Sequence, residues 1–202
     1  MLKSPDPHYP RYTARPLPPY RFIIGENPHP QENPQGHSYR QPLGIYKFND
    51  RVSYHLSLED AELLDPLNWF ENEAYLFGVD LYNYAFWWEA HEIFEHLWRQ
   101  FSRTSSPGYF FQGLIQVSGA FLKWHLKQQE GLEHLHTAGL EHLKFVCDQQ
   151  THFMGIALMD HIAKLSSHFR AVIADPARWP DPLAAYPFID LHFSSSFKKF
   201  LS

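Results

Sequence analysis

The densest group of ionisable side chains in this 202-residue sequence is the run WEAHEIFEHLW at positions 88–98. At about 100° per residue, His91 and Glu95 share one side of a helix, and so do Glu92 and His96. An imidazole and a carboxylate one turn apart can converge on a divalent cation, and a neighbouring carboxylate can accept a proton from water. The run therefore predicts a metal site in which His91 and Glu95 are ligands and Glu92 is the general base.

Two zinc motifs resemble this run, and the sequence misses each of them by one residue. The motif His-Glu-x-x-His requires a second histidine where Glu95 stands, and the inverted form His-x-x-Glu-His requires a histidine where Glu92 stands. A zinc, iron or manganese site here needs at least one further ligand. Spacing does not choose among the candidates His29, His37, His125, His136 and Glu133. The alternative is a solvated helix face with local ion pairs, such as Glu95 with Arg99.

A second polar group follows in a mostly apolar segment. Gln112 and Gln116 are spaced i,i+4, and Gly113 beside them permits close approach of another helix. A buried glutamine needs partners for both its oxygen and its amide nitrogen. We therefore expect these glutamines to pair with the carboxylates and imidazole of the preceding helix. The alternative is that both face water.

The elements that must position these residues are helices. Periodicity and capping patterns predict helical segments at 57–64, 66–78, 80 or 83 to 101, 106–128, 131–149 and 156–174. We expect an all-α fold, a bundle of about five helices spanning residues 57–202. Residues 1–56 form a different region, because it contains most of the sixteen prolines. Proline favours extended backbone, and many aromatic residues accompany it, so we expect an extended arm laid across the bundle.

Composition excludes several classes of function. The net charge is −5 without a basic stripe, which argues against nucleic acid as a partner. The single cysteine, Cys147, excludes an internal disulfide framework. Neither a signal peptide nor an apolar run of membrane-spanning length is present, so we expect a cytoplasmic protein that does not bind membranes. The partners that remain are a small-molecule ligand and a second copy of the chain, contacted through the arm.

Three motifs together resemble a known family. They are GVDLYN at 78–83, WEAHE at 88–92 with Glu95 and Trp98, and FQGLIQ at 111–116. This combination, over about residues 67–150, is similar to domain of unknown function 309, an all-helical family. Some of its members carry the label of predicted metal-dependent hydrolase. The resemblance implies that the polar residues of both motif helices form one site, with Trp98 beside it: Glu89, His91, Glu92, Glu95, Gln112 and Gln116.

Two hypotheses about function follow. In the first, the chain is a metal-dependent hydrolase, with His91 and Glu95 as ligands and Glu92 as the base. In the second, it is a non-catalytic structural or ligand-binding module. Its polar network then fixes helix packing, and loss of His91 or Gln116 lowers stability without affecting any ligand.

Overall fold

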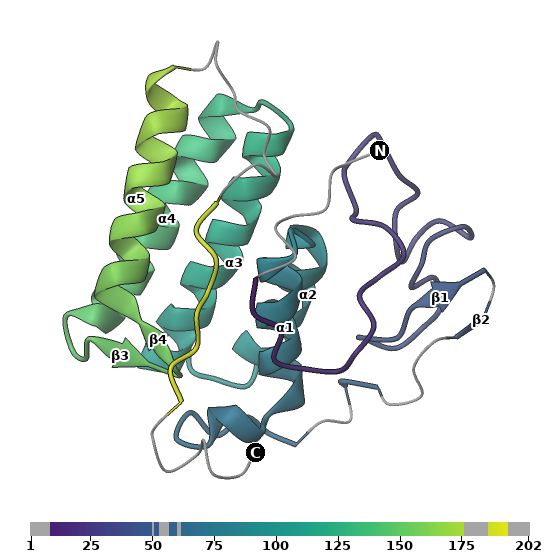
Figure 1. Ribbon diagram of the computed structural model, residues 1–202, viewed down its shortest axis with the longest axis horizontal. Helices are drawn as coiled ribbons and strands as arrows, with labels where there is room; N and C mark the ends of the chain where they lie inside the picture. The colour runs from purple at the N-terminus through teal and green to yellow at the C-terminus, as the bar shows by residue number, and fades with distance from the viewer. Residues whose placement is uncertain (1–8, 50, 53–56, 60–61, 176–185, 194–202) are drawn as a thin grey trace.

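The computed structural model describes residues 9–49, 51–52, 57–59, 62–175 and 186–193. Most of the described chain is helical, which confirms the predicted fold class (Figure 1). The helices are α1 (Glu73–Asn83), α2 (Trp87–Trp98), α3 (Ser106–His125), α4 (Gln129–Cys147) and α5 (Leu158–Ala174), with a 3-10 turn η1 (Trp69–Glu71) before α1. Two short antiparallel hairpins complete the described elements: β1 (Lys47–Phe48) with β2 (Arg51–Val52), and β3 (His152–Phe153) with β4 (Ile156–Ala157).

Each helix packs on the next one along the chain, from α1 to α5. The closest approach is between α3 and α4, where glycines face the partner helix. A Cβ added to Gly113 would lie 2.7 Å from Leu143 Cγ, and one added to Gly139 would lie 3.0 Å from Val117 Cγ2. Side chains at these positions would push the two helices apart. The core is rich in large aromatic rings, such as Trp87 stacked on Phe121 with ring centroids 5.1 Å apart.

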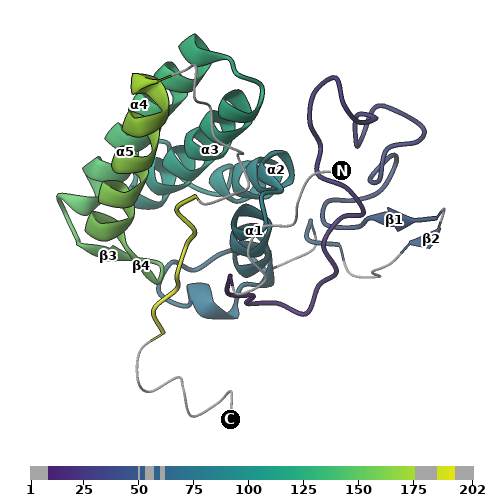
Figure 2. The same ribbon diagram turned by 45° about the horizontal axis from the view of Figure 1, so that its top comes forward.

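Most of the described part of the arm lies on the opposite side of α1 and α2 from α4 and α5, whereas its first residues pass over α1 (Figures 1 and 2). A buried carboxylate on α1 holds its first part. Asp80 accepts hydrogen bonds from the backbone N–H groups of Tyr12 (2.6 Å) and Thr13 (2.9 Å) and from the Thr13 hydroxyl (2.6 Å). Arg11 Nε lies 3.2 Å from the same carboxylate. Burial raises the pKa of Asp80, although these partners favour its charged form.

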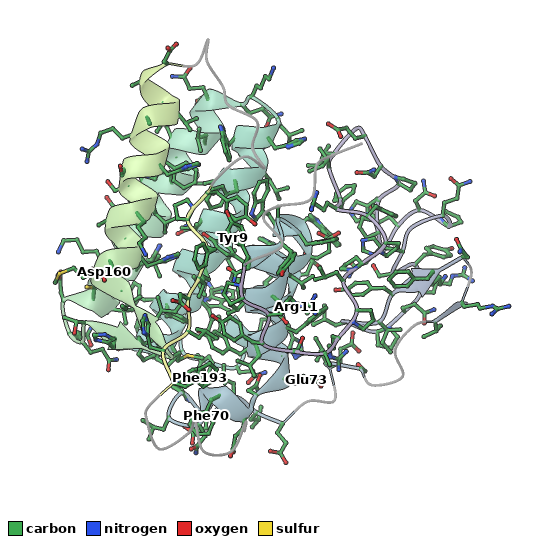
Figure 3. All side chains as sticks on the ribbon, viewed as in Figure 1. Tyr9, Arg11, Phe70, Glu73, Asp160 and Phe193 are labelled. Carbon is green, nitrogen blue, oxygen red and sulfur yellow. The ribbon has the colours of Figure 1, made fainter. Side chains whose placement is uncertain are left out.

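The C-terminal segment 186–193 also crosses α1. The Asn83 side chain donates to the Ile189 carbonyl (2.8 Å) and accepts from the Ile189 N–H (2.7 Å). Its amide group therefore satisfies both backbone groups of Ile189, as a neighbouring β-strand would. The Tyr12 hydroxyl accepts from the Leu191 N–H at 2.8 Å, which ties the segment to the arm. Figure 3 shows Phe193, at the end of this segment, at the same end of the molecule as Phe70 of η1.

The expected helix at 57–64 is wrong, because the described residues 57–59 and 62–64 are not helical. The helix expected at 66–78 is also displaced, and α1 begins at Glu73. The Asp65 carboxylate accepts bonds from the Leu67 N–H and the Asn68 side chain, which closes a turn there. Asn72 caps α1 instead, by accepting from the Tyr75 N–H.

We also expected a helix boundary near Gly78, and this is wrong because α1 continues through Gly78 to Asn83. The glycine serves packing, since an added Cβ would lie 2.8 Å from Phe94 Cε1 on α2. None of the described helices is both long and apolar enough to cross a membrane.

Candidate metal centre on α2

One side of α2 is fixed in the core, and the other side carries the predicted metal ligands. Ala90, Ile93, Phe94 and Leu97 are buried and hold the orientation of the helix. His91, Glu92 and Glu95 are partly exposed, at 33%, 24% and 32% of their side-chain surface. The helix therefore presents an imidazole and two carboxylates to solvent from a rigid base.

These three side chains converge. Each offers one ligand atom, and the three atoms lie within 4.8 Å of one another. His91 Nδ1 lies 3.3 Å from Glu92 Oε1, but this buried nitrogen has no hydrogen-bond partner. Glu95 Oε1 accepts from Arg99 Nη2 at 2.9 Å, which confirms the local ion pair expected from their i,i+4 spacing. Arg99 is 67% exposed, so this pair contributes little to stability and yields easily to a cation.

The donor set fits a divalent cation. Imidazole nitrogen and carboxylate oxygen suit zinc, iron and manganese, with bond lengths of roughly 2.0 to 2.2 Å. Ligand atoms of one ion then lie at most roughly 4.4 Å apart. Small side-chain rotations bring the three atoms into that range, because none of the three side chains is packed in the core. His91 Nδ1, buried without a hydrogen-bond partner, gains from such a contact.

The five other ligand candidates do not join this group. Within the described part of the chain, His91, Glu92 and Glu95 are the only cluster of three or more side chains that could hold a metal. His37 binds Glu89, His125 Nε2 lies 3.3 Å from Glu26 Oε1, and the His136 ring packs on Phe169. The group therefore contains the two expected ligands and the expected base, and among the described residues no further candidate joins it.

Glu89, the remaining acid of the motif, binds the arm. It lies in the first turn of α2 and is 2% exposed. Its Oε1 accepts from the Phe22 N–H (3.0 Å) and from His37 Nε2 (2.9 Å), and His37 is itself 1% exposed. The start of a helix favours a negative charge, which adds to these two bonds. The side-chain partner of Glu89 is therefore His37, which lies 52 residues away in the sequence and not on the same helix.

A cavity of about 10 Å³ is lined both by Glu89, which with His37 forms what we call the Glu89 clamp, and by Glu92 of the candidate metal cluster. Its walls come from the arm and from α2, and they include Ser38, Tyr46, Trp88, Glu89 and Glu92. That volume is roughly what one water molecule needs. Burial, followed by the charges of Glu89 and Glu92, raises the pKa of the Tyr46 hydroxyl well above its usual value. Tyr46 is thus a neutral group close to both carboxylates. Glu92 belongs both to this cavity and to the cluster of ligands.

The two glutamines of α3 do not complete this site. Gln116 Oε1 lies 2.7 Å from His142 Nδ1 on α4, and the same nitrogen lies 2.8 Å from the Ala138 carbonyl. In the described chain, neither Gln112 nor Gln116 hydrogen-bonds to α2. The expected pairing with the acids of α2 is therefore wrong for Gln116, because its side of α3 packs against α4. His142 is half-buried at this contact.

Trp98 stands at the far end of α2 from the arm. Its ring is half-buried, and the Arg103 guanidinium lies over it at 5.1 Å from the ring centroid. The role of His37 as the partner of Glu89 was not expected from the sequence, where His37 was only a candidate metal ligand. The one available signal was the accumulation of prolines and aromatic residues around it, which indicates a docked segment but not its target.

Residues 75–135 match the model of a protein family described as domain of unknown function (DUF309). The matched region runs from α1 into α4 and includes the whole of α2 and α3. The arm, α5 and the C-terminal segment lie outside it. No match was found among curated proteins.

Proposed function

We propose that this chain, whose residues 75–135 belong to the DUF309 family, binds a divalent cation through α2 and hydrolyses a small substrate there. The observation that supports this proposal is the convergence of His91, Glu92 and Glu95, with ligand atoms within 4.8 Å on one partly exposed turn. The solvent-facing side of the cluster is open, as it is in catalytic metal sites, whereas structural sites are closed by four protein ligands.

Each side chain of the cluster has a role in this proposal. His91 and Glu95 hold the cation from positions one helical turn apart. A bound divalent cation supplies Lewis acidity and makes a nearby water more acidic. With a cation bound, Glu92 would be the residue that accepts a proton from the attacking water, since its carboxylate lies at the same turn and also lines the adjacent cavity. Glu89, bound to the arm, keeps α2 and the arm in register beside the site.

Metal binding tests the first half of the proposal. We expect untagged protein to take up a stoichiometric amount of zinc or manganese and to melt at a higher temperature with it. The double variant His91→Ala with Glu95→Gln loses both ligands. We expect its metal affinity to fall by more than roughly 10- to 100-fold, which is the effect of losing a group that only hydrogen-bonds to a ligand. His134→Ala, an exposed histidine on α4, is the matched control and should bind as the wild type does. Equal metal affinity in all three proteins would overturn the proposal.

Hydrolysis tests the second half. Metal-loaded protein should cleave members of a panel of chromogenic esters and phosphoesters. Glu92→Gln keeps the size and polarity of the side chain but loses the proton acceptor, so we expect the rate to fall about 10²- to 10⁴-fold with metal content less affected. A rate that is unchanged in Glu92→Gln would contradict the role of Glu92.

A second candidate function is that of a non-catalytic module. The observation that favours it is the Glu89 clamp, since Glu89, the buried acid of α2, holds the arm by two hydrogen bonds. In that case the polar residues of α2 keep the arm docked, and metal addition changes neither the melting temperature nor any activity.

A further inference from the structure

Two leucines outside the α2 cluster are almost fully exposed. Leu63 is 82% exposed and Leu67 is 84% exposed, the highest values among the large apolar side chains of the described residues. They lie in the segment that leads into η1 and α1. Single apolar residues on a surface need no explanation, so the significance of Leu63 and Leu67 depends on what holds them outward and on what lies beside them.

The backbone holds both leucines outward. Leu64, between them, is buried, and its N–H donates to Gln100 Oε1 at 2.9 Å. Beyond Leu67, the Trp69 side chain is also buried. The turn between these anchors is closed by Asp65, whose side chain accepts from the Leu67 N–H (2.9 Å) and from Asn68 Nδ2 (2.7 Å). Neither leucine can turn inward without displacing a buried neighbour.

Hollows flank both leucines, and the one beside Leu63 is acidic. It measures about 360 Å³, and among the described residues it is lined by four acids and no basic residue: Glu62, Asp65, Glu71 and Glu73. The Arg15 guanidinium reaches Glu73 from the arm with two contacts of 3.0 Å, so a guanidinium already binds at its edge. The hollow beside Leu67 measures about 390 Å³ and is more apolar, with Trp69, Phe153 and Met154 in its wall. Figure 3 shows Glu73, Phe70 and Phe193 at this end of the molecule.

We propose that this Leu63–Leu67 surface docks a basic amphipathic segment of another protein. Apolar side chains of the partner cover Leu63 and Leu67, and its lysines or arginines meet the carboxylates of Glu62 and Glu71. The acidic rim repels nucleic acid and anionic lipid surfaces. It also disfavours a second copy of the chain, because a symmetric contact would place the same acids against each other in a protein of net charge −5.

A peptide titration tests the proposal. The probe is a fluorescent amphipathic peptide of leucine and lysine, and its matched control has glutamate in place of lysine. We expect the full chain to bind the lysine peptide more tightly than the control by fluorescence anisotropy. Leu63→Ser with Leu67→Ser should weaken binding at least about tenfold. Glu62→Gln with Glu71→Gln should weaken it and reduce its salt dependence.

Met159→Ser is the control variant, because Met159 is 61% exposed on α5, away from this surface. It should bind the lysine peptide as the wild type does. All of these side chains are exposed, so we expect unchanged melting temperatures, which separates loss of binding from loss of fold. Equal affinity for the two peptides, or unaltered binding by the double-serine variant, would overturn the proposal. So would a dimer in light scattering that the double-serine variant dissociates, since the surface would then be an interface between copies.

Discussion

At the scale of single residues, the buried charges next to the arm are paired across long sequence distances. Glu89 meets His37, Asp80 meets Arg11, and Arg15 meets Glu73. A buried charge without a partner costs far more than the net gain of the pair, so each of these contacts fixes where the arm lies. His91, in contrast, is partly exposed, and its nearest charged partner is Glu92, the next residue in the chain.

Because of the Glu89 clamp, we expect loss of His37 to lower the free energy of unfolding more than loss of His91 does. His37→Ala leaves the Glu89 carboxylate buried with only the Phe22 N–H, so we expect the free energy of unfolding to fall by about 3 kcal/mol. His91→Ala removes no contact to another helix and should cost less than about 1 kcal/mol in metal-free protein. Urea denaturation of both variants makes the comparison. Equal losses would show that His91 belongs to a structural network, as the second hypothesis from the sequence required.

A double-mutant cycle measures the interaction free energy between His37 and Glu89. If His37 and Glu89 act as a pair, then His37→Ala combined with Glu89→Ala should cost clearly less than the sum of the two single losses. Additive losses would mean that the 2.9 Å contact between the two side chains contributes nothing of its own.

At the scale of elements, the β3–β4 hairpin shows how a turn and the core constrain each other. Its two turn residues, Met154 and Gly155, have φ values of 44° and 79°. Two successive positive φ angles are typical of the two-residue turns that match strand twist. The Met154 carbonyl also accepts from the buried Tyr75 hydroxyl at 2.7 Å, so the turn is attached to α1.

This turn predicts a large effect for a small substitution. A Cβ on Gly155 would lie 2.5 Å from Trp69 Cη2, and its backbone is in the left-handed region. We expect Gly155→Ala to lower the free energy of unfolding by about 2 to 4 kcal/mol. Gly25→Ala is a matched control, since Gly25 has φ 86° but no atom within 4 Å of an added Cβ. It should cost only about 1 kcal/mol, and a similar loss in both variants would exclude the Trp69 contact as the cause.

At the scale of the whole molecule, the arm and the C-terminal segment stabilise each other across α1. The Tyr9 ring stacks on Phe188 with centroids 4.8 Å apart, and the Tyr12 hydroxyl accepts from the Leu191 N–H. Both segments also bond to buried polar side chains of α1. Each segment therefore depends on the other for part of its contacts. Removal of one segment would leave the aromatic rings and hydrogen-bonding groups of the other without these partners.

Buried histidines predict that the fold as a whole is sensitive to acid. Burial, with the nearby Lys164 charge, lowers the pKa of His161 to about 4, and burial lowers the pKa of His168 to about 4. An unfolded histidine titrates near about 6.5. Between these values the unfolded chain binds protons that the folded chain does not, so stability falls as the pH drops from about 6.5 to about 4. For His161 alone this loss amounts to about 3 kcal/mol.

Chemical denaturation at pH 7 and at pH 4.5 measures this loss. His161→Gln removes the titrating group, so its stability should depend less on pH than that of the wild type, whatever its stability at neutral pH. His134→Ala, on the exposed side of α4, should keep the wild-type dependence. If His161→Gln and the wild type lose the same stability on acidification, His161 is not the group responsible.

Features that depend on neighbours within about one helical turn can be predicted from the amino-acid sequence. The helical class, the convergence of His91 with Glu95 and the ion pair of Glu95 with Arg99 follow from the 3.6-residue period, because i,i+4 positions meet in any helix. The DUF309 resemblance located the same helix through its motifs.

Which groups meet across elements depends on how the helices and the arm pack in three dimensions. The side of α3 that carries Gln116 could have faced either neighbour, and close packing through Gly113 and Gly139 turned it to α4 and His142. Glu89 found its partner in the arm because the chain path brings His37 back across 52 residues to the first turn of α2. Such contacts depend on the direction in which the elements pack, and a local periodicity contains no information about that direction.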